Sequence, residues 1–173
     1  MLRLSKTYFS NSILSLQTGG QIGQAIEPII NPNNLRIEGW YSQNYGEKGE
    51  FILPSSHVRD FIAKGIVVDN HDALTLPADM VRLQSVIDTR FQLIGKLVQT
   101  ESGKKLGKII DFAVADESFY IQKLYVTPRF LRGLTNEQLL IDRNAIIEIT
   151  DKKIIVADQS VRANSKSPVL ADA

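Results

Sequence analysis

The sequence predicts an all-β fold with one short helix, built as two tandem modules. Sliding the 173-residue chain on itself by 84 positions reveals a weak internal repeat, and an offset of 88 extends it to residues 51–54 and 139–142. The matched pairs include Gly19 with Gly103, Gly23 with Gly107 and Tyr41 with Tyr125. In both copies apolar residues fall on alternate positions, the period of a strand with one buried face. We therefore expect modules at residues 8–86 and 90–163, followed by a small, polar and disordered tail at 164–173.

The first module is expected to contain strands at 22–30 and 35–41, joined by a turn at the Asn-Pro-Asn-Asn sequence of residues 31–34. Ser56 is placed to N-cap a helix over residues 57–64, and Gly65 to end it as a C′ residue. Beyond this helix, residues 66–68 and 73–76 are expected to pair as a tight hairpin. Trp40 is expected in the core, because the second copy has Leu124 there.

The second module shows the same alternation at 106–114 and 119–125, which predicts a hairpin with its turn at 115–118. Residues 148–150 and 154–156 predict a second, tighter hairpin. Irregular stretches at 42–50 and 127–138 occupy equivalent places in the two copies, and only a short connection, residues 85–90, separates the modules.

The repeated glycines have a structural interpretation. Gly103 suits a hairpin position that requires a positive φ, and Gly107 allows a bulge or a close backbone crossing where a short strand bends. Their counterparts Gly19 and Gly23 are assigned the same turn and strand roles.

Composition excludes several classes of function. The chain has no cysteine, two histidines and a net charge of +1, so we expect neither a disulfide nor a metal site, and bulk charge indicates no partner. No Gly-x-Ser-x-Gly elbow or phosphate-binding Gly-rich loop occurs, so we expect no catalytic residue, no cofactor and no enzymatic activity. No apolar run approaches bilayer length and the N-terminus lacks a signal-peptide core, which predicts a cytoplasmic protein without membrane insertion.

In the second module residues 93–111 read LIGKLVQTESGKKLGKIID, and they are followed by Leu-Ile-Asp at 140–142, Ala-Ile-Ile at 145–147 and the hairpin at 151–156. With these motifs the second module resembles the PRC-barrel domain family. The first copy resembles the same family less closely, with Glu27 where the second has Asp111 and a longer expected helix. The family is named for the cytoplasmic part of the photosynthetic reaction centre H subunit and includes the C-terminal half of the ribosome maturation factor RimM. The resemblance implies two tandem PRC-type β-barrels that bind macromolecules and have no recognised catalytic residues.

Charge is divided unevenly between the modules. Residues 1–88 hold 7 basic and 9 acidic residues, whereas residues 89–173 hold 13 and 10. Around one hairpin of the second module the basic side chains form a candidate partner-binding cluster, which could contact RNA phosphate or an acidic protein face. A solvated strand face whose lysines discourage edge pairing explains the same residues without a ligand. The cluster consists of Lys96, Lys104, Lys105 and Lys108, together with Arg129 and Arg132 of the following loop.

Two functional hypotheses of different class follow. The first is a non-enzymatic adaptor that binds and positions a protein partner. The alternative is an RNA- or ribosome-associated maturation factor in which Lys104, Lys105 and Lys108 contact phosphates. A third option is a structural adaptor associated with stress or with the cell envelope. The sequence carries no signal for an oligomeric state.

Overall fold

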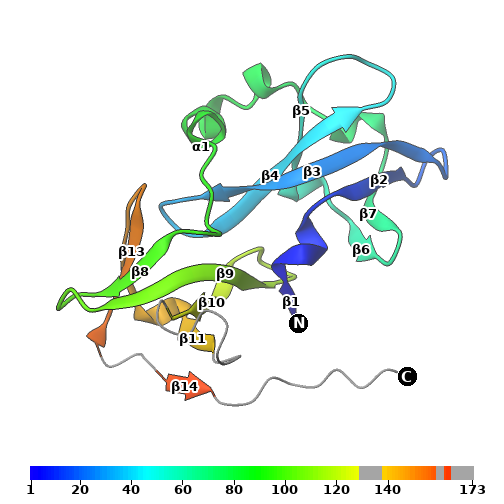
Figure 1. Ribbon diagram of the computed structural model, residues 1–173. Helices are drawn as coiled ribbons and strands as arrows, with labels where there is room; N and C mark the ends of the chain where they lie inside the picture. The colour runs from blue at the N-terminus through cyan, green and yellow to red at the C-terminus, as the bar shows by residue number, and fades with distance from the viewer. Residues whose placement is uncertain (129–137, 159–161, 165–173) are drawn as a thin grey trace, which may run out of the picture. The chain divides into compact units, whose positions relative to one another are not determined.

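The computed structural model describes residues 1–128, 138–158 and 162–164 (Figure 1). These residues are mostly β-strand, with one short α-helix, which confirms the predicted fold class. The chain divides into two compact units, of which the first comprises residues 1–91 and 114–120 and the second residues 92–113 and 121–173. The predicted modules assigned residues 114–120 to the second copy, whereas here their contacts place them in the first unit.

The first unit is built on a six-stranded sheet with the order β5-β4-β3-β2-β7-β6. Neighbouring strands are antiparallel except β2 and β7, which run parallel. The strands of this sheet are β2 (Asn11–Ser15), β3 (Gln21–Asn31), β4 (Arg36–Asn44), β5 (Phe51–Pro54), β6 (Asp60–Ile62) and β7 (Gly65–Val68), and the unit also contains β1 (Leu2–Leu4), which lies outside this sheet. Its helices are α1 (Gln84–Thr89) and the 3₁₀ turns η1 (Ser5–Tyr8), η2 (Ser55–His57), η3 (His71–Ala73), η4 (Pro77–Asp79) and η5 (Val81–Leu83).

The second unit repeats this topology, with the strand order β12-β13-β8-β9-β10-β11-β14. Here β13 and β8 form the parallel pair, and β14 adds a further antiparallel strand beside β11. Its elements are β8 (Leu97–Thr100), β9 (Lys105–Ala115), β10 (Ile121–Thr127), β11 (Gln138–Asp142), the 3₁₀ turn η7 (Arg143–Ala145), β12 (Ile146–Ile149), β13 (Lys153–Val156) and β14 (Arg162–Asn164).

The two strand orders correspond element by element, so the internal repeat is confirmed. The long strands β3 and β9 have the same length of 11 residues and agree in burial at every position except the fourth. Residues 55–57 and 143–145 form matching 3₁₀ turns at the predicted offset of 88. The repeat thus encodes a common backbone in which few side chains are identical.

The predicted hairpins of the long strands are also confirmed. Residues 31–36 link β3 to β4, and residues 115–121 link β9 to β10. The turn residues Leu35 and Phe119 occupy equivalent positions and share positive φ angles of 50° and 60°. Each N–H donates to the carbonyl four residues earlier, that of Asn31 or Ala115, at 2.8 Å. The hairpin predicted at 148–156 is confirmed as β12 and β13.

The predicted helix over residues 57–64 is wrong. Only Ser55–His57 form a 3₁₀ turn, and Asp60–Ile62 form β6, which pairs with β7. Gly65 does not end a helix. It opens β7 at φ +146°, where an added Cβ would lie 2.1 Å from the Ser12 carbonyl oxygen. The pairing of β6 with β7, and of β7 with β2, therefore outweighs the local helix-capping signal of Ser56.

The predicted hairpin of residues 66–68 with 73–76 is also wrong. β7 lies between β2 and β6, so both of its edges are already paired. Residues 71–73 form a 3₁₀ turn, and Thr75 instead exchanges two backbone hydrogen bonds with Ile52 on the outer edge of β5. The one α-helix among the described residues lies at 84–89 and overlaps the stretch 85–90 that the sequence indicated only as a connection.

Neither sheet closes into a barrel within the described residues. In the first unit the terminal strands of the order, β5 and β6, do not pair with each other. The expected barrel shape is therefore replaced by open sheets, and the outer edges are occupied by short segments such as Thr75 and β14.

An aromatic cluster fills one side of the first sheet. Trp40 is fully buried, as predicted, and its indole N–H donates to the Tyr8 carbonyl at 2.9 Å. The ring of Phe119 packs edge-on against Trp40, with centroids 5.8 Å apart, and Phe61 lies 5.3 Å from the Tyr8 ring. The Tyr8 hydroxyl donates to Asp116 at 3.0 Å. Residues of the 114–120 segment thus complete the core of the first unit.

We expect Gly107→Ala to lower the free energy of unfolding by about 3 kcal/mol, and Gly103→Ala by only about 1 kcal/mol. Both glycines have positive φ, of +150° and +89°, so both substitutions strain the backbone. An added Cβ at Gly107 would also lie 2.0 Å from the Thr127 carbonyl oxygen, whereas at Gly103 it would meet no atom within 4 Å. Urea denaturation followed by circular dichroism measures the difference, and equal losses would refute a special constraint at Gly107.

We expect Tyr8 to make the first unit sensitive to alkaline pH. Burial, then the hydrogen bond to Asp116 and its charge, raises the pKa of Tyr8 far above the ordinary 10.0. A folded-state pKa above the unfolded value means that this stabilisation is complete below about pH 10 and is lost as the pH rises further.

Trp40 fluorescence during urea unfolding at several pH values checks this expectation. The difference in stability between the wild type and Tyr8→Phe should be constant below about pH 9 and should shrink above about pH 10. Tyr45→Phe, at a tyrosine whose side chain is 58% exposed, is the matched control and should show no such trend. A difference for Tyr8→Phe that stays constant up to pH 11 would contradict the assignment.

Candidate interaction surface

Strand pairing places three lysines of the second unit on one side of its sheet. Leu97 of β8 lies between Lys108 of β9 and Lys153 of β13 in the hydrogen-bonded register. One step along, Gln99 lies between Lys105 and Ile155. Residues directly opposite one another on neighbouring strands project to the same side of a sheet. We call this surface the lysine face, and it consists of Leu97, Gln99, Lys105, Lys108, Lys153 and Ile155.

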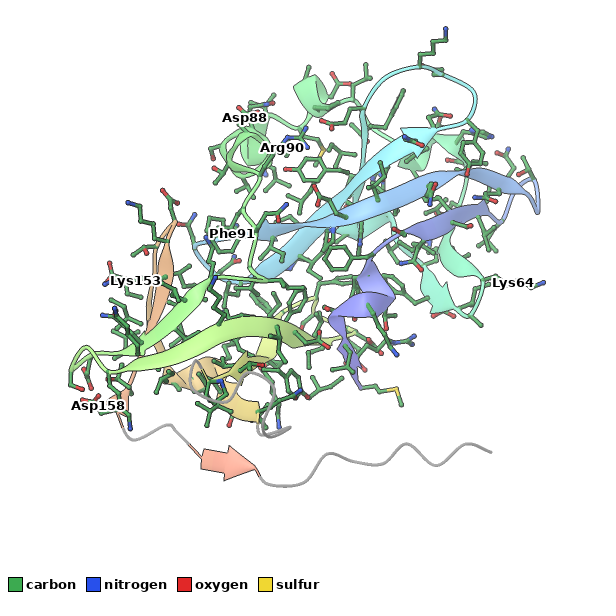
Figure 2. All side chains as sticks on the ribbon, in the orientation of Figure 1. Lys64, Asp88, Arg90, Phe91, Lys153 and Asp158 are labelled. Carbon is green, nitrogen blue, oxygen red and sulfur yellow. The ribbon has the colours of Figure 1, made fainter. Side chains whose placement is uncertain are left out.

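The lysine face is solvent-accessible and positively charged. Lys105 and Lys108 are exposed, whereas Lys153 and the three residues without charge are half-buried. Two strand spacings separate Lys108 from Lys153, which puts their Cα atoms about 10 Å apart. Among the ion pairs between described residues, none involves these three lysines. Figure 2 shows Lys153 on β13, the strand that runs beside β8.

The neighbouring Lys96 is tied to the β12–β13 turn. Its ammonium group donates to the Asp151 carbonyl oxygen. Burial lowers the pKa of Lys96, and the charge of Asp151 partly offsets that effect. The Lys96 side chain therefore helps to hold this turn in place, and it also adds positive charge beside the lysine face.

The turn between β8 and β9 is held by local hydrogen bonds. The Gly103 N–H donates to the Thr100 carbonyl at 2.9 Å, and the Lys104 N–H donates to the Thr100 hydroxyl at 3.2 Å. The Ser102 hydroxyl donates to Asp158 at 2.7 Å, and this bond, with one from Thr100, lowers the pKa of Asp158. Lys104 itself is exposed at the tip of the turn.

The residues predicted from the sequence are only partly brought together. Lys105 and Lys108 share the lysine face, Lys96 and Lys104 flank it, and Arg129 and Arg132 lie outside the described residues. Gly19 has a positive φ of 68° in the β2–β3 turn, as Gly103 has in the β8–β9 turn. An added Cβ at Gly23 would lie 2.2 Å from the Gln43 carbonyl oxygen, the counterpart of the contact at Gly107.

Lys153 was missed by the sequence argument. It lies more than fifty residues beyond β8 in the chain, and the parallel pairing of β13 with β8 brings it to Leu97. The internal repeat was the one sequence signal that could have predicted this pairing, because it makes β13 the counterpart of β7. It did not do so, because the segment before β7 was interpreted as a helix.

Two further polar side chains of the first unit, those of His57 and Asp69, have structural partners. The His57 imidazole Nδ1 lies 3.1 Å from the Ala73 carbonyl, and Asp69 forms a two-pronged ion pair with Arg59 at 2.8 and 2.6 Å. Across the described ranges, no group of three or more acidic, histidine or cysteine side chains could hold a metal ion. The helices of those ranges are all too short or too polar to cross a membrane.

Comparison with known proteins identifies one domain family. Residues 88–161, which include the whole lysine face, match the model of the PRC-barrel domain. No curated protein matches the chain.

Proposed function

Residues 88–161 match the PRC-barrel domain family, and on that premise we propose that the chain is a non-enzymatic adaptor that binds and positions a protein partner through the lysine face. The observation that carries the proposal is the contrast between the two copies of the repeat. At the positions of Lys105 and Lys108 the first copy has Gln21 and Gln24. The shared backbone therefore needs no lysine at these two places. At the place of Lys153 the first copy has Gly65, whose φ of +146° Lys153 does not share, so the backbones differ there.

The composition of the lysine face favours a protein over RNA. Its lysines alternate with Leu97 and Ile155, which add apolar contact area, and exposed Glu148 pairs with Ile155 at its border. Single-stranded RNA is usually bound by aromatic side chains on which bases stack, and none of the face residues is aromatic. An acidic protein surface with apolar residues matches the face in both charge and polarity.

The test is affinity capture of the tagged chain from native lysate, with and without RNase, at about 0.1 M and about 0.5 M salt, between which exposed charges become strongly screened. The variant Lys105→Glu/Lys108→Glu/Lys153→Glu reverses the lysine face. The matched control, Lys6→Glu/Lys48→Glu/Lys64→Glu, reverses three exposed lysines of the first unit.

We expect one discrete protein, resistant to RNase, whose recovery drops about tenfold in the lysine-face variant and at high salt but not in the control, because charged contacts at an interface set association and specificity. Loss of the captured material on RNase treatment would replace this proposal with the RNA-associated alternative. Equal capture by both variants would make the lysines a solvated face.

A further inference from the structure

The first unit covers the second side of its sheet with its own helix. Tyr41 on β4 pairs with Glu27 on β3 and with Ile52 on β5. These three residues form a row across the three strands, in which an acidic residue, a tyrosine and an aliphatic residue lie side by side. Helix α1 packs on this row, and the resulting cluster contains Ile29, Tyr41, Ile52, Val86 and Ile87, with Met80 and Leu83 beside it.

Two polar contacts fix the helix in place. The Tyr41 hydroxyl donates to the Ile87 carbonyl at 2.6 Å, near the end of α1. The guanidinium of Arg90, labelled in Figure 2, lies 4.4 Å from the centre of the Tyr41 ring and forms two hydrogen bonds of 2.7 Å with Glu50. The sheet therefore holds the segment of α1 through two adjacent branched aliphatic residues, one backbone carbonyl and one arginine of that segment.

The second unit repeats this row, and no α-helix among its described residues covers it. Tyr125 pairs with Leu140 as Tyr41 pairs with Ile52, and Asp111 stands at the position of Glu27. Tyr41 and Ile52 are 5% and 1% exposed, whereas Tyr125 and Leu140 are only half-buried. The described part of the second unit contains no α-helix, and within it the Tyr125 hydroxyl has no hydrogen-bond partner.

Both rows contain an acidic residue beside the tyrosine, although Lys123, two residues before Tyr125, stands where the first unit has Gly39. Glu27 and Glu50 both act on Arg90 in the first unit and raise its pKa. In the second unit burial, and then the charge of Asp111, raises the pKa of Tyr125, whose side chain is half-buried. An arginine placed over the Tyr125 ring would meet a π face, as Arg90 does over Tyr41.

We propose that the face formed by Asp111, Tyr125 and Leu140 binds a short helix of a protein partner that carries two adjacent branched aliphatic residues and an arginine three positions later. We call it the tyrosine face. The aliphatic pair fills the position that Val86 and Ile87 occupy in the first unit, and the Tyr125 hydroxyl donates to a main-chain carbonyl near the end of the helix. This site is separate from the lysine face and does not depend on the function proposed for it.

The probe is a fluorescent peptide with the sequence of residues 76–91, titrated into the full chain and followed by anisotropy. Tyr125→Phe removes only the hydroxyl of the proposed site, and Tyr41→Phe removes its counterpart in the first unit. Leu140→Asp introduces a charge into the face, and Ile147→Asp does so at a 55% exposed isoleucine outside it. Nuclear magnetic resonance of the wild type with unlabelled peptide locates the contact without any substitution.

We expect saturable binding that perturbs the resonances of Tyr125 and Leu140. It should weaken about fivefold in Tyr125→Phe, the worth of one hydrogen bond, and at least tenfold in Leu140→Asp, while Tyr41→Phe and Ile147→Asp bind as the wild type. Reversal of the lysine face should leave peptide binding unchanged, so the two proposals can fail separately.

Absence of binding at about 1 mM peptide, an affinity of only about −4 kcal/mol, would overturn the proposal. So would binding whose resonance shifts lie elsewhere. A variant that ends at Asn164 tests whether the C-terminal residues of the chain itself, rather than a partner, occupy the tyrosine face. If that variant binds the peptide at least tenfold more tightly than the full chain, residues 165–173 cover the face and the assignment to a partner is wrong.

Discussion

The close approach of two backbones at Gly23 and Gly107 is the constraint on which each unit depends. At both glycines a Cβ would lie within 2.2 Å of a carbonyl oxygen on the next strand, so no other residue fits without a shift of the backbone. The ladder on the other side of each glycine also changes register there, between Ile13 and Leu14 in one unit and between Val98 and Gln99 in the other. An extra residue beside a glycine bends the long strand and lets it serve two neighbours. The remaining strands take their positions from that bend.

The repeat in the sequence predicted the strands that lie near one another in the chain, and it failed where a distant partner decides the structure. The alternation around residues 31–34 and 115–118 was sufficient for both long hairpins, because their pairing is local. The capping signal of Ser56 was local too, yet β6 and β7 replaced the helix, because a parallel partner, β2, lies about fifty residues earlier. The same parallel pairing concealed Lys153 from the candidate surface.

The two copies of the repeat have diverged in what their surfaces offer rather than in their backbones. The first copy has uncharged Gln21 and Gln24 where the second has Lys105 and Lys108, and it buries Tyr41 beneath α1. The second keeps Tyr125 half-exposed and carries the charge. A backbone that both sequences support leaves surface positions such as those of the two glutamines free to change, because their side chains contribute little to the core. The differences between the copies therefore mark the surfaces that are not needed for folding.

The place of residues 114–120 in the first unit has a consequence for the order in which the chain is made. Phe119 and Asp116 reach Trp40 and Tyr8 only after more than twenty further residues have followed Phe91. The chain is synthesised from the N-terminus, so part of the aromatic core of the first unit stays uncovered until residue 120 has left the ribosome. By then all of β9, which ends at Ala115, must already have emerged. Completion of the first unit is therefore linked in time to the folding of the second, although the two are consecutive copies of one repeat.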